Sequence, residues 1–355
     1  MPAPTQSVPA LAIRQRVLKN RRNTMYTKYL ITGGSGFLGS TLLEALKDSP
    51  AEIRALVLEN DPLAGHLPGH VQIIYGDVCD AASLESFFAQ ADENTCVIHC
   101  AGIVSVASNP GQKIYDVNVG GTQNILRLCR EKGVGKLVHV SSVHAIPEKP
   151  KGTEITEETH FSPDLVQGDY AKSKAMATAL VLEAAEAGLN ASVVFPSGII
   201  GPGSREEGSI SQLLLSYLSG KLPLAVKGGY DFVDVRDVAA GILACSQQGL
   251  PGHGYILSGH YASIQDILEA AKNAASIRKK VGFLPIKLAR LVAPFYEKWC
   301  LLRRIPLFFT PYAVGVLDSN GRFSRKAAET VLGFRPRSLE SSIRDMVLWL
   351  KKPRQ

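Results

Sequence analysis

Tyr170 and Lys174 are spaced so that together they could carry out proton transfer. They are four residues apart in a run of good helix formers that begins at Gly168, so they would share one face of a helix. A tyrosine with a pKa near 10 is a poor base at neutral pH, but a neighbouring ammonium group favours the phenolate. Moving that pKa to about 7 takes on the order of 4 kcal/mol of differential interaction. The same spacing also describes a core tyrosine beside a solvated lysine, so it needs support from other residues.

A serine hydroxyl would complete this chemistry. Ser142 follows the apolar run 136–140, which is typical of a buried strand. Its hydroxyl could hold a substrate oxygen by a hydrogen bond while Tyr170 exchanges a proton with the same oxygen. A hydride would pass between the substrate carbon and a nicotinamide ring, whose positive charge in the oxidised form also favours the phenolate. The three residues therefore predict oxidation of a secondary alcohol or reduction of a ketone.

Glycines between an apolar strand and a helix predict a dinucleotide site. The run 29–31 is typical of a buried strand, Gly33, Gly36 and Gly39 follow it, and 41–47 has apolar residues at helical spacing. Glycines allow backbone angles that a Cβ forbids and let the main chain approach a ligand closely. The helix start beyond them presents N–H groups and a positive dipole end to a pyrophosphate. An ordinary glycine turn is the alternative, but the strand and helix on either side favour dinucleotide binding.

The residue that ends the next strand is expected to contact the adenosine ribose. The strand 52–58 is followed by Glu59, about 20 positions beyond the glycines. An acid there accepts hydrogen bonds from the ribose hydroxyls and favours NAD, whereas a basic residue would pair with the extra phosphate of NADP. Glu59 therefore favours NAD. NADP is the alternative, because Arg54 could be the basic residue at this position if the side chains of the strand alternated in the opposite phase.

The alternation of strands and helices predicts an α/β fold with a Rossmann-type, doubly wound parallel sheet. In such sheets ligands bind beyond the carboxyl ends of the strands. Asp77 and Val78, the pair Ala101–Gly102, and Ser142 all follow predicted strands, as the glycine turn does, so one crevice should collect them. The further strands are expected at 71–75, 96–102, 136–140 and 254–258, and the helices at 83–90, 116–130, 168–186, 209–218 and 263–275.

Two polar residues inside these elements have structural interpretations. His99 lies within a strand, and we expect a buried, hydrogen-bonded side chain there rather than a ligand or a base. Asn118 lies inside a helix, where its amide could point to solvent or bridge strands by backbone hydrogen bonds. No metal site is expected.

Composition is that of a globular protein with a large core. The 355 residues are 45% apolar and 20% charged, and the net charge is +7. No nucleic-acid motif accompanies the basic charge, so we interpret it as solvated surface and expect no nucleic-acid partner. The six cysteines form no C-x-x-C pair, and several lie in apolar runs, which is typical of a reduced cytoplasmic protein. No apolar run reaches the roughly 18 residues that span a bilayer.

The chain resembles the extended short-chain dehydrogenase/reductase family, within the NAD-dependent epimerase/dehydratase superfamily. The resemblance covers about residues 25–345 and is closest to the dihydroflavonol reductase-like and 3β-hydroxysteroid dehydrogenase-like branch. Six motifs carry it in order and spacing: Thr32-Gly33-x-x-Gly36-x-x-Gly39, Gly76-Asp77-Val78, Cys100-Ala101-Gly102, Asn118-Val-x-Gly-Thr122, Ser141-Ser142 and Tyr170-x-x-x-Lys174. The stretch 195–202 is also similar to that branch's segment beside the nicotinamide.

The resemblance implies roles for individual residues. Ser142, Tyr170 and Lys174 would be catalytic, Lys174 would also bind the nicotinamide ribose, and Asn118 would be structural or part of a proton relay. The implied and predicted cofactor contacts are Gly33, Ser35, Gly36, Phe37, Leu38, Glu59, Asp77, Val78, Ala101, Gly102, Tyr170, Lys174, Pro196, Ser197 and Gly198. The sequence departs from the family at Leu58, where NADP-using relatives often carry Arg, and at Phe195, where many relatives carry Arg.

The second half is expected to hold most of a substrate-binding lobe. We assign residues 1–24 to a basic leader outside the fold, 25–195 to the dinucleotide-binding core, and 196–224 and 261–345 to the lobe; residues 225–260 would return to the core. Within that stretch, 225–234 should rejoin the main sheet. The apolar region 281–317 should line or cover an apolar pocket, because four prolines, at 285, 294, 306 and 311, should break any long amphipathic helix. An interfacial membrane helix is the alternative there.

The prediction from sequence is therefore an NAD(P)-dependent oxidoreductase for an apolar, ring-containing alcohol or ketone. A nucleotide-sugar epimerase or dehydratase that retains NAD remains an alternative in the same fold. A non-catalytic, NAD(P)-sensing protein is an alternative from another class. Family resemblance also implies a homodimer.

Overall fold

A seven-stranded parallel sheet forms the centre of the protein in the computed structural model, which describes residues 26–107, 110–204, 209–277, 280–303 and 309–352. The strands lie in the order β10-β6-β5-β4-β1-β2-β3, so the order reverses between β1 and β4. The strands are β1 (Lys28–Thr32), β2 (Glu52–Val57), β3 (Gln72–Tyr75), β4 (Thr95–His99), β5 (Lys136–Val140), β6 (Ala191–Pro196) and β10 (Gly254–Leu257). Every residue of β1, β4, β5 and β6 is buried, as expected for a parallel sheet covered on both faces.

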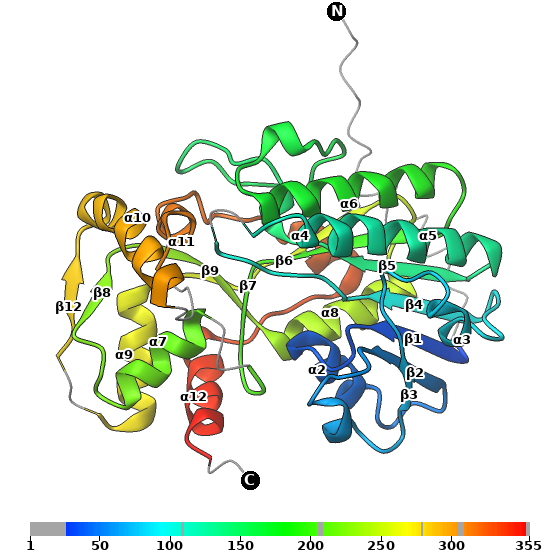
Figure 1. Ribbon diagram of the computed structural model, residues 1–355, viewed down its shortest axis with the longest axis horizontal. Coiled ribbons are helices and arrows are strands. Elements are labelled where there is room, and N and C mark those ends of the chain that lie inside the picture. The colour runs from blue at the N-terminus through cyan, green and yellow to red at the C-terminus, as the bar shows by residue number, and fades with distance from the viewer. Residues whose placement is uncertain (1–25, 108–109, 205–208, 278–279, 304–308, 353–355) are drawn as a thin grey trace, which may run out of the picture.

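Helices cover both faces of this sheet (Figure 1). One layer holds α4 (Lys113–Tyr115), α5 (Gly121–Glu131) and α6 (Asp169–Glu186), and the opposite layer holds α2 (Phe37–Ala45) and α8 (Val235–Gln248). A π turn at Asp116–Gly120 joins α4 to α5, and the helix predicted at 83–90 is the short α3 (Leu84–Phe87). Two apolar cores result, one on each side of the sheet. The predicted doubly wound Rossmann-type fold is confirmed.

A smaller lobe lies beside the carboxyl ends of the strands. It contains a three-stranded sheet of order β11-β9-β7 and a two-stranded sheet of β12 and β8. Its strands are β7 (Gly198–Ile200), β8 (Leu224–Val226), β9 (Gly229–Asp234), β11 (His260–Ser263) and β12 (Gly282–Leu284). Its helices are α7 (Ser209–Leu218), α9 (Ile264–Ala275), α10 (Ile286–Arg303), α11 (Pro311–Leu317) and α12 (Leu339–Leu350). Ser263 caps α9 with a capping box, at the start of the helix predicted at 263–275.

The prediction that 225–234 rejoins the main sheet is wrong. β9 lies between β7, which is parallel to it, and β11, which is antiparallel, so both of its edges are already paired. The edge position next to β6 in the main sheet is taken by β10. What returns to the core from this part of the chain is therefore α8 and β10.

Pro294 does not interrupt its helix, contrary to the expectation from sequence. It lies inside the 18-residue α10, on the exposed side. Pro311 does mark a helix boundary, because it opens α11 behind the Thr310 cap. Pro306 and residues 1–24 lie outside the described residues. Among the helices that the structure describes, none has the length and apolarity needed to cross a bilayer.

Partly buried ion pairs attach the C-terminal helix to the core. The Asp234 side chain is fully buried and accepts hydrogen bonds from Arg236, whose guanidinium also contacts Asp345 of α12 at 2.9 Å. Asp237 of α8 binds Arg337, immediately before α12, through both its carboxylate oxygens. Bidentate pairs of this kind fix orientation as well as distance. They hold α12 against the start of α8.

Candidate active site

The glycine turn after β1 is closely packed on the sheet. Gly33 has φ of +68°, and a Cβ there would lie 2.9 Å from the backbone nitrogen of Ala101, which follows β4. A Cβ on Gly39 would overlap the carbonyl oxygen of Gly33. Because β1 and β4 are neighbours at the point where the strand order reverses, this turn lies where doubly wound sheets bind their ligands.

The start of α2 fits a pyrophosphate. Its N-cap is Gly36, which offers no side-chain cap to the first N–H groups of the helix. Those groups and the helix dipole together form an anion site, and the glycines leave room for a ligand to reach it. Ser35, Phe37 and Leu38 lie at this helix start. The chain therefore has the cradle that a dinucleotide requires.

An acid that the sequence interpretation missed is tied to the glycine turn. Ser35 Oγ donates a 2.6 Å hydrogen bond to Asp61 Oδ2, and the Leu63 N–H donates to the other Asp61 oxygen at 2.9 Å. Glu59, the predicted ribose contact, is exposed two residues beyond β2. Asp61 was within reach of the sequence argument, since it lies in the same strand-to-helix loop. The register of that loop, which only the fold defines, decides which acid faces the turn.

Asp77 and Val78 follow β3 at the edge of the sheet, beyond β2. Asp77 is exposed and accepts a 2.9 Å hydrogen bond from the Cys79 N–H, which shapes its own loop. Val78 is buried and packs against Gly121 at the start of α5. These two residues lie at the same end of the sheet as the glycine turn.

Small residues after β4 bring the cofactor side of the site close to α6. Ala101 N–H donates to Thr32 Oγ1 at 3.1 Å, which joins the β4 and β1 ends. A Cβ on Gly102 would lie 3.1 Å from Asn118 Oδ1 and 3.2 Å from Lys174 Nζ. A side chain there would therefore displace one of the two.

Asn118 has a structural role in this arrangement. Its amide accepts from the Ile103 N–H at 2.7 Å and donates to the Ile103 carbonyl at 3.0 Å and to Ser173 Oγ at 3.0 Å. The side chain is buried and ties the loop after β4 to α6. Of the two orientations that the sequence left open, the bridging one is correct.

His99 is also structural, as predicted. Its ring nitrogens bond to Thr32 Oγ1 at 2.7 Å and to Thr122 Oγ1 at 3.1 Å. Burial lowers the pKa of His99 to about 3, so the ring is neutral at physiological pH. A neutral imidazole with both ring nitrogens in hydrogen bonds has a structural role in the sheet rather than that of an acid or a base.

The structure brings Ser142, Tyr170 and Lys174 together. Tyr170 and Lys174 lie on the buried face of α6, and Ser142 follows the end of β5. Ser142 accepts a hydrogen bond from the His144 N–H at 3.2 Å, and Lys174 Nζ donates to the Val140 carbonyl at 2.9 Å. The end of β5 therefore orients the Lys174 ammonium group, and the turn that follows β5 orients the Ser142 hydroxyl.

Burial dominates the protonation of this group. It raises the pKa of Tyr170, and a hydrogen bond with Ser142 opposes the rise. Burial lowers the pKa of Lys174 to about 8. At neutral pH the phenol therefore keeps its proton and the lysine remains charged. Because the pKa of Lys174 lies close to neutral pH, small changes in its surroundings would alter its protonation.

The segment 196–198 joins the two lobes. Pro196 ends β6 in the main sheet, Ser197 is buried, and Gly198 begins β7 of the smaller sheet. Phe195 is fully buried and stacks on Phe161 with 5.4 Å between ring centroids. Phe195 is thus a core residue, so the substitution relative to the family alters packing behind the site.

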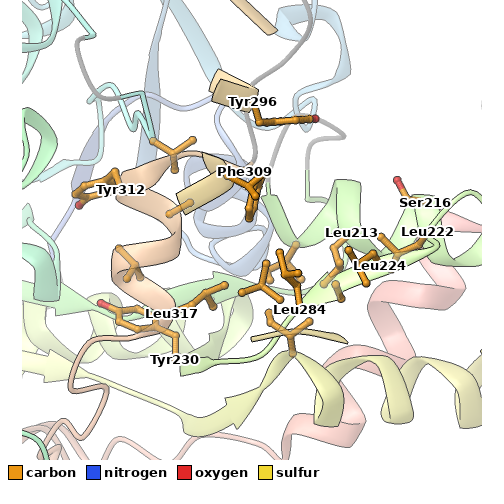
Figure 2. A pocket seen from close by; sticks show the side chains of 18 of the residues that line it. Leu213, Ser216, Leu222, Leu224, Tyr230, Leu284, Tyr296, Phe309, Tyr312 and Leu317 are labelled. Atoms are coloured by element: carbon orange, nitrogen blue, oxygen red, sulfur yellow. The ribbon is translucent and has the colours of Figure 1, made fainter. Parts of the chain in front are cut away.

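A cavity of about 500 Å³ opens from Tyr170 into the smaller lobe. Figure 2 shows leucine and aromatic side chains from several elements turned toward this space. The region 281–317 supplies part of the wall, as predicted, through residues of β12, α10 and α11. The walls include Val104, His144, Tyr170, Leu213, Leu222, Leu224, Tyr230, Phe232, Leu284, Val292, Tyr296, Phe309, Tyr312, Ala313, Val316 and Leu317.

Three aromatic residues beside Tyr170 escaped the sequence interpretation. The half-buried His144 ring contacts the hydroxyls of Tyr230 at 3.4 Å and Tyr312 at 3.3 Å, and its centroid lies 5.7 Å from that of Tyr170. Tyr312 also packs on Gly168, where a Cβ would lie 2.6 Å from its ring. Only the position of His144, two residues after Ser142, gave any signal in the sequence.

Comparison with known proteins identifies the family. Residues 29–257 match the model of the NAD dependent epimerase/dehydratase family. The chain belongs to the NAD dependent epimerase/dehydratase family. Two similar proteins are sterol demethylase protein B of Methylococcus capsulatus, 28% identical over 91% of this chain and 98% of that protein, and a putative dihydroflavonol 4-reductase of Synechocystis, 30% identical over 91% and 94%.

A solved structure shows the same fold for this family member. The UDP-glucose 4-epimerase of Thermus thermophilus in complex with NAD superposes with a TM-score of 0.73, at 22% identity, over 91% of this chain and 99% of that one. The predicted family, the Rossmann-type fold and the class of enzyme, an oxidoreductase acting on CH–OH or C=O, are confirmed. A nicotinamide dinucleotide is the cofactor class of the family.

Proposed function

We propose that this family member transfers hydride between a nicotinamide dinucleotide and a secondary alcohol or ketone carried on an apolar, ring-containing body. The observation that carries the proposal is the cavity that begins at Tyr170. Among the residues that the structure describes, those that line the cavity are almost all aliphatic or aromatic, and Lys221 is the single charged residue. A volume of about 500 Å³ is sufficient for a fused-ring substrate.

The chain's own residues would handle the proton. Tyr170 would give its phenol proton to the substrate oxygen in reduction or take it back in oxidation, and Ser142 would hold that oxygen by a hydrogen bond. Lys174, held by the Val140 carbonyl, would stabilise the phenolate and bind the nicotinamide ribose. The bound dinucleotide supplies the hydride or accepts it.

The proposed cofactor contacts follow the carboxyl edge of the sheet. Ser35, Phe37 and Leu38 at the start of α2 would hold the pyrophosphate, and Ala101 and Gly102 would let the dinucleotide pass across β4. The acids after β2, Glu59 and Asp61, support NAD rather than NADP, because a carboxylate repels the additional phosphate of NADP. The remaining proposed contacts are Gly33, Gly36, Asp77, Val78, Pro196, Ser197 and Gly198.

Sugar-nucleotide chemistry has less support. A nucleotide-sugar substrate brings two phosphates, which proteins usually bind with several cationic or N–H groups. The described cavity lining offers Lys221 alone for that purpose. The likeness to epimerases of known structure concerns the fold.

Turnover assays over two substrate panels test the proposal. Consumption of NADH and of NADPH should be followed with hydrophobic cyclic ketones in one panel, and sugar products by NMR with UDP-sugars in the other. We expect net oxidation of reduced cofactor on the cyclic ketones. Sugar inversion without net redox change would instead establish the epimerase alternative. Cofactor binding with no turnover in either panel, together with a cofactor-dependent protein partner, would establish a sensing function.

We also propose a homodimer located in the cytoplasm. Family resemblance supports the dimer, and α5 and α6 lie side by side on one face, where a second copy could pack against them (Figure 1). Buried thiols at Cys96, Cys129, Cys245 and Cys300 support a reducing compartment. Sedimentation that detects monomer alone would reject the dimer, and fractionation of cells tests the compartment.

A further inference from the structure

Helix α10 turns an apolar stripe toward solvent. Phe295 is 71% exposed, Leu302 is 81% exposed and Leu291 is 66% exposed. At 100° per residue these side chains fall on one face of the helix together with Leu288, Val292 and Trp299, all of them at least 41% exposed. This contiguous set differs from the single, scattered apolar residues that are normal on a protein surface. We call these six residues the α10 stripe.

The α10 stripe is not part of the core. The opposite face of the same helix, with Ala289, Ala293 and Cys300, is fully buried. Ala289 and Ala293 pack with Val314 of α11 in a small apolar cluster of their own. The helix is therefore already attached to the protein through this buried face, to which Ile286 also contributes, whereas no residue of the α10 stripe belongs to that cluster. Figure 1 shows α10 at the outer end of the smaller lobe, away from the seven-stranded sheet.

Basic side chains flank the α10 stripe. Lys287 and Lys298 are exposed on one side of it, and Arg303 is exposed on the other. Arg290, also exposed, forms an ion pair with Asp318. The one acid within α10, Glu297, is buried and cannot balance these charges at the surface. A partner for this face must therefore accept large apolar side chains and also present negative charge.

We propose that α10 is a docking element for an anionic phospholipid bilayer. The α10 stripe would enter the boundary between headgroups and acyl chains, and Lys287, Lys298 and Arg303 would contact anionic headgroups, as in interfacial amphipathic helices. A second copy of this chain fits less well, because pairing two stripes would bring like charges together. Trp299 suits the interface, where an aromatic body and a polar N–H are both accommodated.

The position of α10 links this surface to the cavity. Val292 belongs to the α10 stripe and also lines the cavity, and Tyr296, on the next turn, lines it too (Figure 2). A docked helix would therefore place the rim of the cavity at the bilayer surface, so an apolar alcohol or ketone could enter without crossing water. This link to substrate supply rests on the proposed function, whereas the docking itself does not.

Vesicle sedimentation of the full-length protein tests the docking. Vesicles of phosphatidylcholine alone should be compared with vesicles that contain about one-third phosphatidylglycerol, at low and high salt. We expect binding to the anionic vesicles, weakened by salt, with a blue shift of tryptophan emission. The double variant F295E/L302E should reduce the partition coefficient by about tenfold or more, since two apolar anchors are replaced by acids. Neither residue lines the cavity, so turnover of a water-soluble ketone should be unchanged.

A matched control separates docking from general surface hydrophobicity. Leu348 of α12 is 52% exposed, and L348E should leave vesicle binding as in the wild type. The proposal is overturned if the wild type does not bind anionic vesicles, or if F295E/L302E binds as the wild type does. It is also overturned if the double variant abolishes self-association rather than vesicle binding, which would identify a second copy as the occupant. Vesicle binding by a protein that turns over no substrate would retain the docking and reject the proposed function.

Discussion

At the scale of single residues, the site depends on a charge kept where water is scarce. Lys174 is buried, and burial lowers its pKa from 10.5 to about 8. That difference corresponds to about 3 kcal/mol spent on keeping the ammonium charged at neutral pH. Functional sites commonly reduce stability in this way, because the group is retained for chemistry rather than for folding.

Replacing Lys174 by methionine should therefore stabilise the protein while abolishing turnover. At pH 7 we expect a gain of about 1 to 2 kcal/mol, after about 1 kcal/mol is subtracted for the lost hydrogen bond to Val140. Between about pH 8 and 10.5 the unfolded wild type holds a proton that the folded form releases, so wild-type stability rises with pH. The advantage of K174M should therefore shrink across this window.

Urea unfolding at pH 7 and pH 10 measures this effect. Lys172, on the same helix but partly exposed, supplies the control K172M, which should have little effect at either pH. A K174M protein that is less stable than the wild type by the same amount at both pH values would contradict the account.

Cofactor preference is a second question at the residue scale. If Asp61, tied to Ser35, faces the adenosine ribose, then D61A should raise the kcat/KM ratio of NADPH to NADH by about tenfold, because a like charge near the extra phosphate is removed. E59A should change the ratio far less. The reverse order of effects would show that the sequence interpretation, which named Glu59, was correct.

The sequence revealed some of these residues and not others for a physical reason. Ser142, Tyr170 and Lys174 belong to local motifs, so their types and spacing were sufficient to find them. His144, Tyr230 and Tyr312 come from three distant parts of the chain, and their hydrogen bonds depend on how the smaller lobe packs. Asp61 lay in the right loop, but the choice between it and Glu59 depends on loop geometry that no propensity defines.

At the scale of elements, the junction of β1 and α2 is the most restrictive feature. A Cβ on Gly39 would overlap the Gly33 carbonyl, so G39A should push the helix away from the turn. We expect a loss of dinucleotide affinity of about a hundredfold or more and destabilisation of about 1 to 3 kcal/mol. Gly65 has open space at its Cβ position and supplies the control G65A. Calorimetric titration measures the NADH affinity of both variants, and equal affinities would contradict the packing argument.

Element types were largely predictable, and pairing partners were not. The apolar runs at β1, β4 and β5 identified a buried parallel sheet because every residue in them is buried. The strand β6, equally buried, was not among the predicted strands. β9 was expected in that sheet, since its sequence resembles a returning strand. Its actual partners, β7 and β11, are short segments whose pairing depends on tertiary packing. Pro294 similarly shows that a proline on an exposed face need not end a helix that is packed on its other side.

At the scale of the whole molecule, the two lobes meet around the cavity, and Tyr170 lies where they meet. Filling the cavity from the smaller lobe should therefore affect substrates by size. Ala313 of α11 lines it, and A313F should lower kcat/KM for fused-ring ketones by about tenfold or more, while small acyclic ketones and NADH affinity change little. Steady-state kinetics on both ketone classes measures this. Equal losses for the two classes would indicate that the cavity is not the substrate site.

The central claim is that the Tyr170 hydroxyl transfers the proton that accompanies hydride transfer. Stopped-flow measurement of hydride transfer in Y170F, with the NADH dissociation constant measured beside it, tests this claim most directly. The substitution removes one oxygen and keeps the buried ring, so the rate should fall by about a hundredfold or more while the dissociation constant stays within about twofold. A Y170F protein that transfers hydride at the wild-type rate would contradict the account.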